Sequence, residues 1–363
     1  MHSKPILVVE NDPFPRLLQA FLDRHNDPQR TAAIADFVAH EVPDYPAWLA
    51  QARMQAPGLY PAEVRLAANQ DELRAALPGA HAVVTESLVI GLPELACADQ
   101  LKVVQKYGTV LRNIDAQACA ARGIKILTLR RRANTGCAEY AFGLMIMLAK
   151  KLNQTPNLLS MEQLQGAGFT PRHFDRRYTS NSNWVRVGGM RNLHGTTMGI
   201  IGLGEIGREL ALRAHAFGMK VLYYQRSRLT VSEEREWHAE YRSFDDLLAA
   251  SDWVLPTLPL VDATRNLLGR DQLAKMKRGA YLVNISRADI VERHALRDAL
   301  ASGHLGGFGL DTFYEEPGSA DDPLLQFKNV IITMRIAAMP RTNAMGDLAE
   351  LMAGLACTLG EIT

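Results

Sequence analysis

Three glycines with the spacing Gly202-x-Gly204-x-x-Gly207 stand between the apolar run MGIIGL and a run with helical periodicity. Glycine at the first position permits a tight turn, at the second it lets a phosphate approach the backbone, and at the third it lets helix and strand pack closely. The amino terminus of the following helix attracts phosphate groups. Because strand, turn and helix are all present in order, the spacing predicts a dinucleotide-binding site.

The residue that closes the next strand normally distinguishes NAD from NADP. An acidic residue there bonds the adenosine ribose 2′-hydroxyl and would repel a 2′-phosphate. Here the place, 23 residues after Gly202, belongs to Gln225, with Arg226 and Arg228 close behind. Two guanidinium groups and no carboxylate favour NADP, since arginine offers paired donors to phosphate. If both arginines only face solvent, NAD remains open.

A permanent cation also ends the last apolar run, where Arg335 follows Val330-Ile331-Ile332-Thr333-Met334. Arg287 and Asp311 likewise follow apolar strand-like runs, AYLVNIS and GGFGL. Open α/β sheets place ligands at the carboxyl ends of their strands. We therefore expect Arg287 and Asp311 to serve a site and not to form a surface ion pair.

Short apolar runs alternate with helical patterns along most of the chain, which predicts an α/β fold with parallel sheets. Four strand-like runs precede residue 130, and six more, with intervening helical patterns, follow Thr197. A long apolar helix is expected at 137–152 and one more helix at 340–363. Between them, residues 153–192 are polar and weakly periodic, and we expect a long arm that packs on a neighbour.

Bulk composition excludes several other classes of protein. The 363 residues suffice for two domains, and a net charge of +1 gives no general attraction to nucleic acid or membrane. The four cysteines are far apart and form no metal-ligand spacing, so we expect reduced thiols in a cytoplasmic protein without a bound metal. The apolar stretch at the amino terminus is too short for a signal peptide or a membrane span.

Three further stretches, together with the glycine motif, resemble the D-isomer-specific 2-hydroxyacid dehydrogenases. The three are the long stretch from Asp252 to Pro317, KYGTVLRNID and NTGCAEYAFGLMIML. The resemblance implies two Rossmann- or flavodoxin-like parallel-sheet domains, with the active site in a cleft. Residues 1–135 and 336–363 would form the substrate domain, and the inserted residues 136–335 the dinucleotide-binding domain. It also implies a homodimer.

The resemblance assigns roles to individual residues. Arg287 would bind the substrate carboxylate and polarise the reacting oxygen, and Glu316 would tune the acid–base residue. Asp311 would hold the nicotinamide carboxamide. Glu205 and Ile206 would offer backbone amides to the pyrophosphate, and further cofactor contacts would come from Leu258, Pro259, Thr264, Ile285 and Ser286. The substrate loop would comprise Lys106, Tyr107, Gly108, Thr109, Val110 and Arg112.

The sequence departs from the family at two places that concern the substrate. Where the family has Thr-Pro-His-Ile-Ala-Gly, this chain has Thr-Met-Arg-Ile-Ala-Ala at 333–338, so Arg335 occupies the place of the catalytic histidine. Histidine exchanges protons near neutral pH, whereas arginine, with a pKa above ~12, only stabilises negative charge. In the substrate loop, Val110 adds bulk and Arg112 reverses a charge.

Three explanations remain open. Hydride transfer to or from a small 2-keto or 2-hydroxy acid persists, with the proton handled by another group such as Lys106 or Tyr107; we favour this one, in the direction of reduction. Alternatively, the reaction needs no proton shuttle, as in formate-like oxidation to carbon dioxide. In the third, the protein is a dinucleotide-binding sensor or a non-redox enzyme on the same fold, in which Glu316 and Arg335 form only an ion pair.

Overall fold

The computed structural model describes residues 4–23, 25 and 27–361, and they divide into two compact units. The first unit comprises the described residues up to Gly136 together with those from Ala338 onward. The second unit, Cys137–Ala337, is inserted between these two segments of the chain. No helix in the described part of the chain is both long and apolar enough to cross a membrane.

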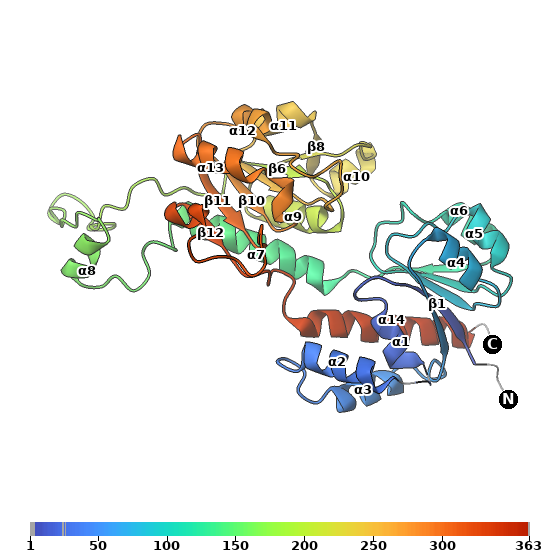
Figure 1. The fold of residues 1–363 in the computed structure, drawn as a ribbon. Helices are drawn as coiled ribbons and strands as arrows, with labels where there is room; N and C mark the ends of the chain where they lie inside the picture. Colours follow the sequence, from blue (N-terminus) through green and yellow to red (C-terminus); the bar gives the residue numbers. More distant parts are fainter. Residues whose placement is uncertain (1–3, 24, 26, 362–363) are drawn as a thin grey trace. The chain divides into compact units, whose positions relative to one another are not determined.

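The first unit is built on a five-stranded sheet whose strands are all parallel, in the order β2-β1-β3-β4-β5. Figure 1 labels β1 of this sheet. The strands are β1 (Ile6–Glu10), β2 (Glu63–Ala67), β3 (Ala82–Thr85), β4 (Val103–Lys106) and β5 (Lys125–Leu127). Strand β2 has no counterpart in the sequence analysis, because the polar residues of EVRLA weaken its apolar pattern. The other four match expected strands.

Helices cover both faces of this sheet, because successive side chains of β1 pack against two different groups of helices. Leu7 and Val9 belong to one buried cluster, with residues of α1, α2, α3 and α14, whereas Val8 belongs to another, with residues of α4, α5 and α6. The helices are α1 (Leu17–Leu22), α2 (Pro28–Val38), α3 (Tyr45–Met54), α4 (Gln70–Ala76), α5 (Leu92–Cys97), α6 (Ala116–Ala121) and α14 (Arg341–Glu361).

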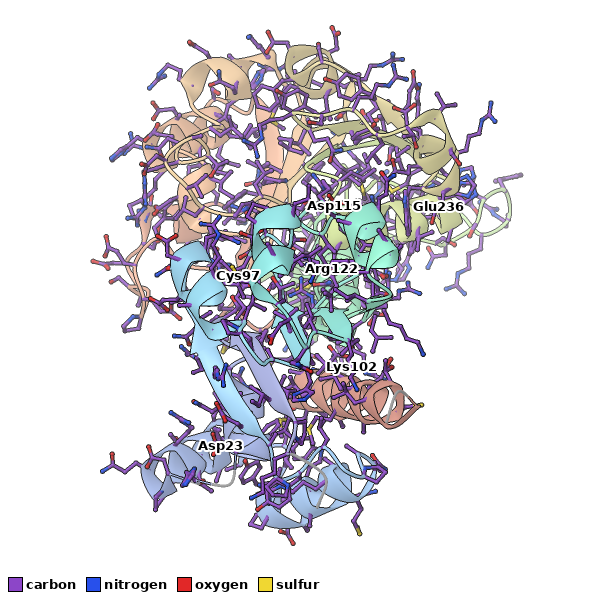
Figure 2. The ribbon with its side chains drawn as sticks, turned by 90° about the vertical axis from the view of Figure 1, so that its right-hand side faces the viewer. Asp23, Cys97, Lys102, Asp115, Arg122 and Glu236 are labelled. Atoms are coloured by element: carbon purple, nitrogen blue, oxygen red, sulfur yellow. The ribbon has the colours of Figure 1, made fainter. Side chains whose placement is uncertain are left out.

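Figure 2 labels Asp115 and Arg122, which flank α6 at its two ends. Asp115 caps the amino terminus by accepting a hydrogen bond from the backbone N–H of Ala118 at 2.9 Å. Arg122 donates to the carbonyl oxygens of Leu95 and Ala98 at the carboxyl end of α5. A cation at a helix carboxyl terminus satisfies free carbonyls, so Arg122 ties α6 to α5.

The second unit has a seven-stranded parallel sheet in the order β12-β11-β10-β9-β6-β7-β8. The strands are β6 (Thr197–Ile201), β7 (Lys220–Tyr224), β8 (Ala239–Tyr241), β9 (Trp253–Pro256), β10 (Ala280–Asn284), β11 (Leu305–Leu310) and β12 (Val330–Ile332). Six of them match expected strands, and β8 is an additional edge strand of only three residues. Both sheets confirm the predicted α/β class.

Helices of the second unit connect these strands, as expected for parallel order. They are α9 (Glu205–Ala216), α10 (Val231–Glu236), α11 (Phe244–Ala250), α12 (Arg270–Lys275), α13 (Arg293–Ala301) and the 3₁₀ helices η1 (Ala288–Ile290) and η2 (Pro323–Gln326). Helix α7 (Arg132–Lys150) precedes an arm of residues 151–192, which contains only α8 (Met161–Gly166) and extends away from the seven-stranded sheet (Figure 1).

Glu10, at the end of β1, fixes the loop that follows β3. Its carboxylate accepts hydrogen bonds from the backbone N–H groups of Glu86, Ser87 and Leu88 at 2.6, 2.8 and 3.1 Å, and from the hydroxyls of Thr85 and Ser87. Burial of Glu10 raises its pKa, but these hydrogen bonds outweigh burial, so the net pKa lies below the usual value. The carboxylate is therefore the stable form in the folded protein.

We predict that Glu10→Gln lowers the free energy of unfolding by about 3 kcal/mol at pH 7, because an amide N–H₂ would face backbone donors. A lowered folded-state pKa means that the carboxylate stabilises the fold above the unfolded-state pKa. The difference between wild type and variant should therefore shrink as the pH falls through the folded-state pKa of Glu10. Urea unfolding at several pH values measures this, with Glu63→Gln at an exposed position as control. A pH-independent difference would contradict the prediction.

Candidate active site

The glycine turn in the second unit has the conformation that dinucleotide binding requires. Gly202 has φ +98°, and a Cβ there would lie 2.8 Å from Leu258 Cδ2 and 3.0 Å from the carbonyl oxygen of Thr257. A Cβ on Gly207 would collide with the carbonyl oxygen of Gly202. These two positions therefore admit only glycine without rearrangement.

Gly204 differs from both, because nothing lies within 4 Å of where its Cβ would be. It is the N-cap of α9, and Glu205 and Ile206 begin the first turn of that helix. The amino terminus of a helix presents free N–H groups that bind phosphate. Open space above the second glycine and a helix terminus beside it fit the pyrophosphate of a dinucleotide.

The candidate residues of this unit share one edge of the seven-stranded sheet, because each follows the carboxyl end of a parallel strand. Gly202 follows β6 and Gln225 follows β7. The other residues follow β9 (Leu258, Pro259 and Thr264), β10 (Ile285, Ser286 and Arg287), β11 (Asp311 and Glu316) and β12 (Arg335). In the strand order, β9 to β12 lie on one side of β6 and β7 on the other. This order suits an extended ligand with its adenosine half at β7.

Arg226 and Arg228, which follow β7, have different surroundings. The Arg228 guanidinium is held by Glu234 of α10 through paired contacts of 2.7 and 2.9 Å, which raise the pKa of Arg228. Glu234 also accepts a hydrogen bond from the Tyr223 hydroxyl. Arg226 is exposed, and the amide nitrogen of Gln225 donates to the carbonyl oxygen of Ser227. The pairing of Arg228 was not apparent from sequence spacing.

Hydroxyl groups in this region hold the loops around the glycine turn. Thr257, just past β9, donates to the carbonyl oxygen of Gly202, and Ser286 donates to that of Pro256 at 2.8 Å. Thr264 donates to the carbonyl oxygen of Pro259 at 2.6 Å and accepts from the backbone N–H of Val261. The loops after β6, β9 and β10 are thereby tied together at the predicted cofactor site.

Arg287 is exposed at the end of β10, and its loop is fixed by Asn284, which is fully buried. The Asn284 side chain donates to the carbonyl oxygen of Arg287 at 2.8 Å and accepts from the backbone N–H of Ser286 at 2.9 Å. Asn284 was not named as a site residue from sequence. A polar side chain inside the apolar strand AYLVN was the available signal, since buried amides need partners.

Asp311 is 2% exposed and organises the loop that carries Arg335. Its carboxylate accepts hydrogen bonds from the Thr333 hydroxyl at 2.7 Å and from the backbone N–H groups of Ile336 and Ala337 at 3.1 and 2.6 Å. The residues that donate these hydrogen bonds lie before and after Arg335 in the sequence. The structure therefore gives Asp311 a positioning role in addition to the cofactor contact that the resemblance implies.

Arg335 forms an ion pair with Glu316, with Nη1 2.9 Å from Oε2. Both side chains are about half exposed, at 51% and 57%, so a ligand can reach either one. The backbone of Arg335 has φ +60°, which is uncommon for a residue with a side chain and often marks a functional position. The guanidinium thus faces the carboxylate that the resemblance pairs with a histidine.

In the first unit, Lys106 and Tyr107 are buried where the substrate loop begins. Lys106 Nζ donates to the carbonyl oxygen of Glu86 and to Asn113 Oδ1, and burial raises the pKa of Tyr107. These features argue for structural roles and against proton transfer by either side chain. Gly108, with φ 148°, is buried, Val110 is half-buried, and Thr109 and Arg112 are exposed.

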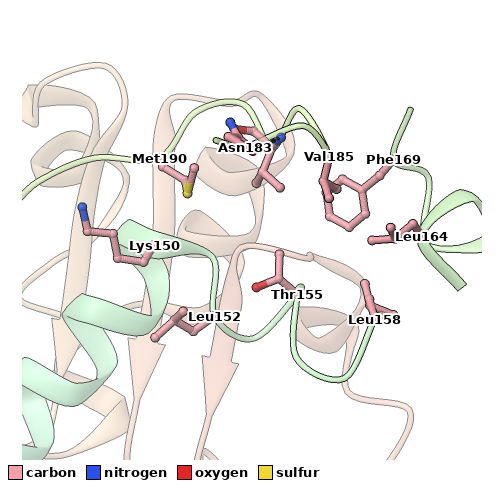
Figure 3. Close-up of a pocket in the computed structure, with 10 residues that line it drawn as sticks. Lys150, Leu152, Thr155, Leu158, Leu164, Phe169, Asn183, Val185 and Met190 are labelled. Atoms are coloured by element: carbon pink, nitrogen blue, oxygen red, sulfur yellow. Dashed lines mark hydrogen bonds between the residues drawn. The ribbon is translucent and has the colours of Figure 1, made fainter. Parts of the chain in front are cut away.

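A separate hollow of about 490 Å³ lies in the arm of the second unit (Figure 3). Figure 3 shows Leu152, Leu158, Leu164 and Phe169 around it, with Met190 at one end. Its lining is mostly apolar and comes from residues 150–190, none of which was a candidate site residue. Among the described residues, no group of three or more His, Cys, Asp or Glu side chains is placed to hold a metal ion.

Comparisons with known proteins agree with this geometry. Residues 171–337 match the model of the D-isomer specific 2-hydroxyacid dehydrogenase NAD-binding domain. The chain is 34% identical over 258 residues to the glyoxylate reductase of Thermococcus kodakarensis, and the matched region makes up 70% of this chain and 72% of that protein. This chain is also 32% identical over 271 residues to glyoxylate/hydroxypyruvate reductase B of Yersinia pestis. The matched region makes up 74% of this chain and 78% of that protein.

Among solved structures, the apo form of D-mandelate dehydrogenase from Rhodotorula graminis shares the fold, with a TM-score of 0.56 and 23% identity over 97% of this chain and 93% of that one. Together, the glycine turn, the family match and the relatives show that the chain belongs to the D-isomer specific 2-hydroxyacid dehydrogenase family. It is an NAD(P)-dependent oxidoreductase of the class that acts on CH–OH groups.

We predict that Gly204→Ala weakens binding of NADPH and NADH at least about tenfold, or about 1.4 kcal/mol, because the methyl group would occupy space for the pyrophosphate. The backbone of Gly204, φ −78° and ψ −157°, accepts alanine, so the melting temperature should stay the same. Gly207→Ala should instead lower the melting temperature. Fluorescence titration and thermal melting measure the two effects, and unchanged affinity of Gly204→Ala would argue against phosphate at this turn.

Proposed function

We propose that the protein reduces a small 2-keto acid of the size of glyoxylate, with NADPH as the preferred cofactor. One observation supports this proposal above all. Arg287 and the Arg335–Glu316 pair follow strands of the same sheet as the glycine turn, and therefore lie at the same edge of that sheet. The names of the relatives at 32–34% identity, glyoxylate reductase and glyoxylate/hydroxypyruvate reductase, support the substrate class. NAD(P)H supplies the hydride when bound.

Arg287 binds the substrate carboxylate, for which a planar guanidinium offers two parallel N–H donors. Asn284 keeps the Arg287 loop in place for this purpose. Arg335 stabilises the negative charge that develops on the carbonyl oxygen during reduction. Glu316 holds the Arg335 guanidinium in the absence of substrate.

In the substrate loop of the first unit, Thr109 and Arg112 are exposed and Val110 is half-buried, and the positive charge of Arg112 attracts anions. The preference for NADPH rests on the missing acidic residue at Gln225 and on the exposed Arg226. Arg228 contributes less, because its charge is already neutralised by Glu234.

We predict that Arg287→Gln lowers kcat/KM for 2-keto acids about 10²–10³-fold, because a charged donor to the reacting acid is lost. The dissociation constant of NADPH should not change. The assay follows nicotinamide absorbance with a panel of 2-keto acids, aldehydes and, in the oxidative direction, formate, using NADPH and NADH in parallel.

Arg297→Gln, an exposed change on α13, is the matched control for this assay and should keep full activity. Equal activity of wild type and Arg287→Gln would contradict the role of Arg287. Tight NADPH binding without turnover of any compound would support the sensor alternative.

We further propose that the protein is a homodimer in which the arm of one chain packs on the second copy. The arm carries exposed large apolar side chains, Leu152, Leu159, Met161, Tyr178 and Met190. Beside them lies the mostly apolar hollow of Figure 3. Apolar surface of this kind is costly to leave in water and commonly marks a protein interface.

Light scattering should therefore give twice the chain mass of 40.1 kDa. Leu159→Arg should shift the protein to the monomer, because Leu159 is 88% exposed and the arginine side chain would place a positive charge in the interface. Leu92→Arg, at an exposed position on α5 in the first unit, is the control and should stay dimeric. A monomeric wild type would refute the dimer.

A further inference from the structure

The segment that follows β7 lies beside the glycine turn of the second unit, and a backbone hydrogen bond joins the two. The N–H of Gly202 donates to the carbonyl oxygen of Tyr224, the last residue of β7, at 2.8 Å. In dinucleotide-binding folds the residues at this place meet the adenosine ribose, which carries the 2′-phosphate of NADPH. The residues from Gln225 to Arg228 are therefore the ones that can distinguish NADPH from NADH.

Two neighbours hold the side chain of Arg228, which is 58% exposed. Glu234 of α10 contacts Nε at 2.7 Å and Nη2 at 2.9 Å, so it occupies the paired donors of one edge of the guanidinium. The ring centroid of Tyr241 lies 5.5 Å from the guanidinium carbon. A phosphate group prefers the same paired donors of an arginine. Glu234 and a phosphate would therefore compete for one edge of Arg228.

Glu234 is fixed in place from the interior of the unit. Only 12% of its side chain is exposed, and Oε1 accepts a hydrogen bond from the hydroxyl of the buried Tyr223 at 2.8 Å. Burial raises the pKa of Tyr223 to about 12, so this hydroxyl keeps the proton that it donates. The same hydroxyl accepts the backbone N–H of Leu229 at 2.9 Å, which ties the loop after Arg228 to Glu234.

Glu234 is also charged under working conditions. Hydrogen bonds from Arg228 hold the pKa of Glu234 below its usual value, so the carboxylate form prevails at neutral pH. By contrast, Arg226 is exposed in a turn that the Gln225 amide closes by donating to the carbonyl oxygen of Ser227 at 2.7 Å. The two arginines of this segment are thus unequal, and the difference between them comes from Glu234.

Resting on the proposed function, we propose that Glu234 determines how strongly the protein distinguishes NADPH from NADH. Its carboxylate competes with the 2′-phosphate for the Arg228 guanidinium, so discrimination depends mainly on Arg226. NADH carries a hydroxyl in place of this phosphate and gains nothing from a second guanidinium. Glu234 therefore narrows the difference in affinity between the two cofactors, and removal of its charge widens that difference.

Glu234→Gln tests this role, because glutamine removes the charge while its carbonyl oxygen can still accept the Tyr223 hydroxyl. We expect the dissociation constants of NADPH and of adenosine 2′,5′-bisphosphate, which carries the same phosphate, to fall about three- to tenfold. Those of NADH and adenosine 5′-monophosphate should not change. Fluorescence titration measures the dinucleotides and calorimetry the adenosine fragments. The melting temperature without nucleotide checks that the variant is folded.

Glu236→Gln is the matched control. Glu236, labelled in Figure 2, is exposed at the carboxyl end of α10, so this variant loses the same charge from the same helix. Its affinities for all four nucleotides should equal those of wild type. An equal gain in NADPH affinity from Glu236→Gln would mean that net charge is responsible and not the contact with Arg228, which would overturn the role of Glu234.

The second test repeats Glu234→Gln in an Arg228→Gln background. Because the gain in NADPH affinity requires the released guanidinium, most of it should be absent when Arg228 is replaced. The same gain with and without Arg228 would contradict the competition. A loss of NADPH affinity in Glu234→Gln alone would show that Glu234 holds Arg228 ready for the phosphate, and would also overturn the proposal.

Failure of this role and failure of the proposed function are distinguishable. If wild type prefers NADPH and reduces 2-keto acids, but Glu234→Gln leaves all four dissociation constants unchanged, Glu234 does not determine discrimination, although the proposed function stands. If wild type binds NADH more tightly than NADPH, the cofactor preference in the proposed function is wrong. A gain in NADPH affinity from Glu234→Gln would even then support the role of Glu234.

Discussion

Parallel alignment of the strands is the constraint on which the rest of this structure depends. In a parallel sheet, the carboxyl ends of all strands lie at the same edge. Residues that are distant in sequence are therefore brought to one edge when each follows a strand. Gly202, Arg287, Asp311 and Arg335 span well over one hundred positions, yet each directly or closely follows a strand of one sheet. The same rule brings Glu10 at the end of β1 beside the loop that follows β3 in the other unit.

Buried polar side chains hold the loops at these sheet edges in place through hydrogen bonds. Glu10, Asn284 and Asp311 each lie at or just past the end of a strand and are nearly or fully buried. Glu10 and Asp311 accept backbone N–H groups from a neighbouring loop, and Asn284 accepts one from its own loop. Burial of an ionised group is costly unless hydrogen bonds compensate, and here several do. Asn284 and Asp311 thereby fix the loops that carry the exposed Arg287 and Arg335, and Glu10 fixes the loop that follows β3.

Much of this was predictable from the sequence. The glycine motif, the alternation of apolar runs and the charged residues after strands led to the fold class, most of the strands and the cofactor type. Strands β2 and β8 were missed because EVRLA and AEY lack a clear apolar pattern and owe their conformation to neighbouring strands. The Arg228–Glu234 and Glu86–Arg131 pairs were also missed, since pairing across loops depends on tertiary structure.

The left-handed backbone at Arg335 bears on which side chains this loop can carry. Histidine is among the residues that occupy this conformation several times more often than most. The Asp311 hydrogen bonds that hold the loop reach Thr333, Ile336 and Ala337 and do not involve the side chain at 335. Exchange of histidine and arginine at position 335 would therefore keep these hydrogen bonds, so the loop can carry either side chain opposite Glu316.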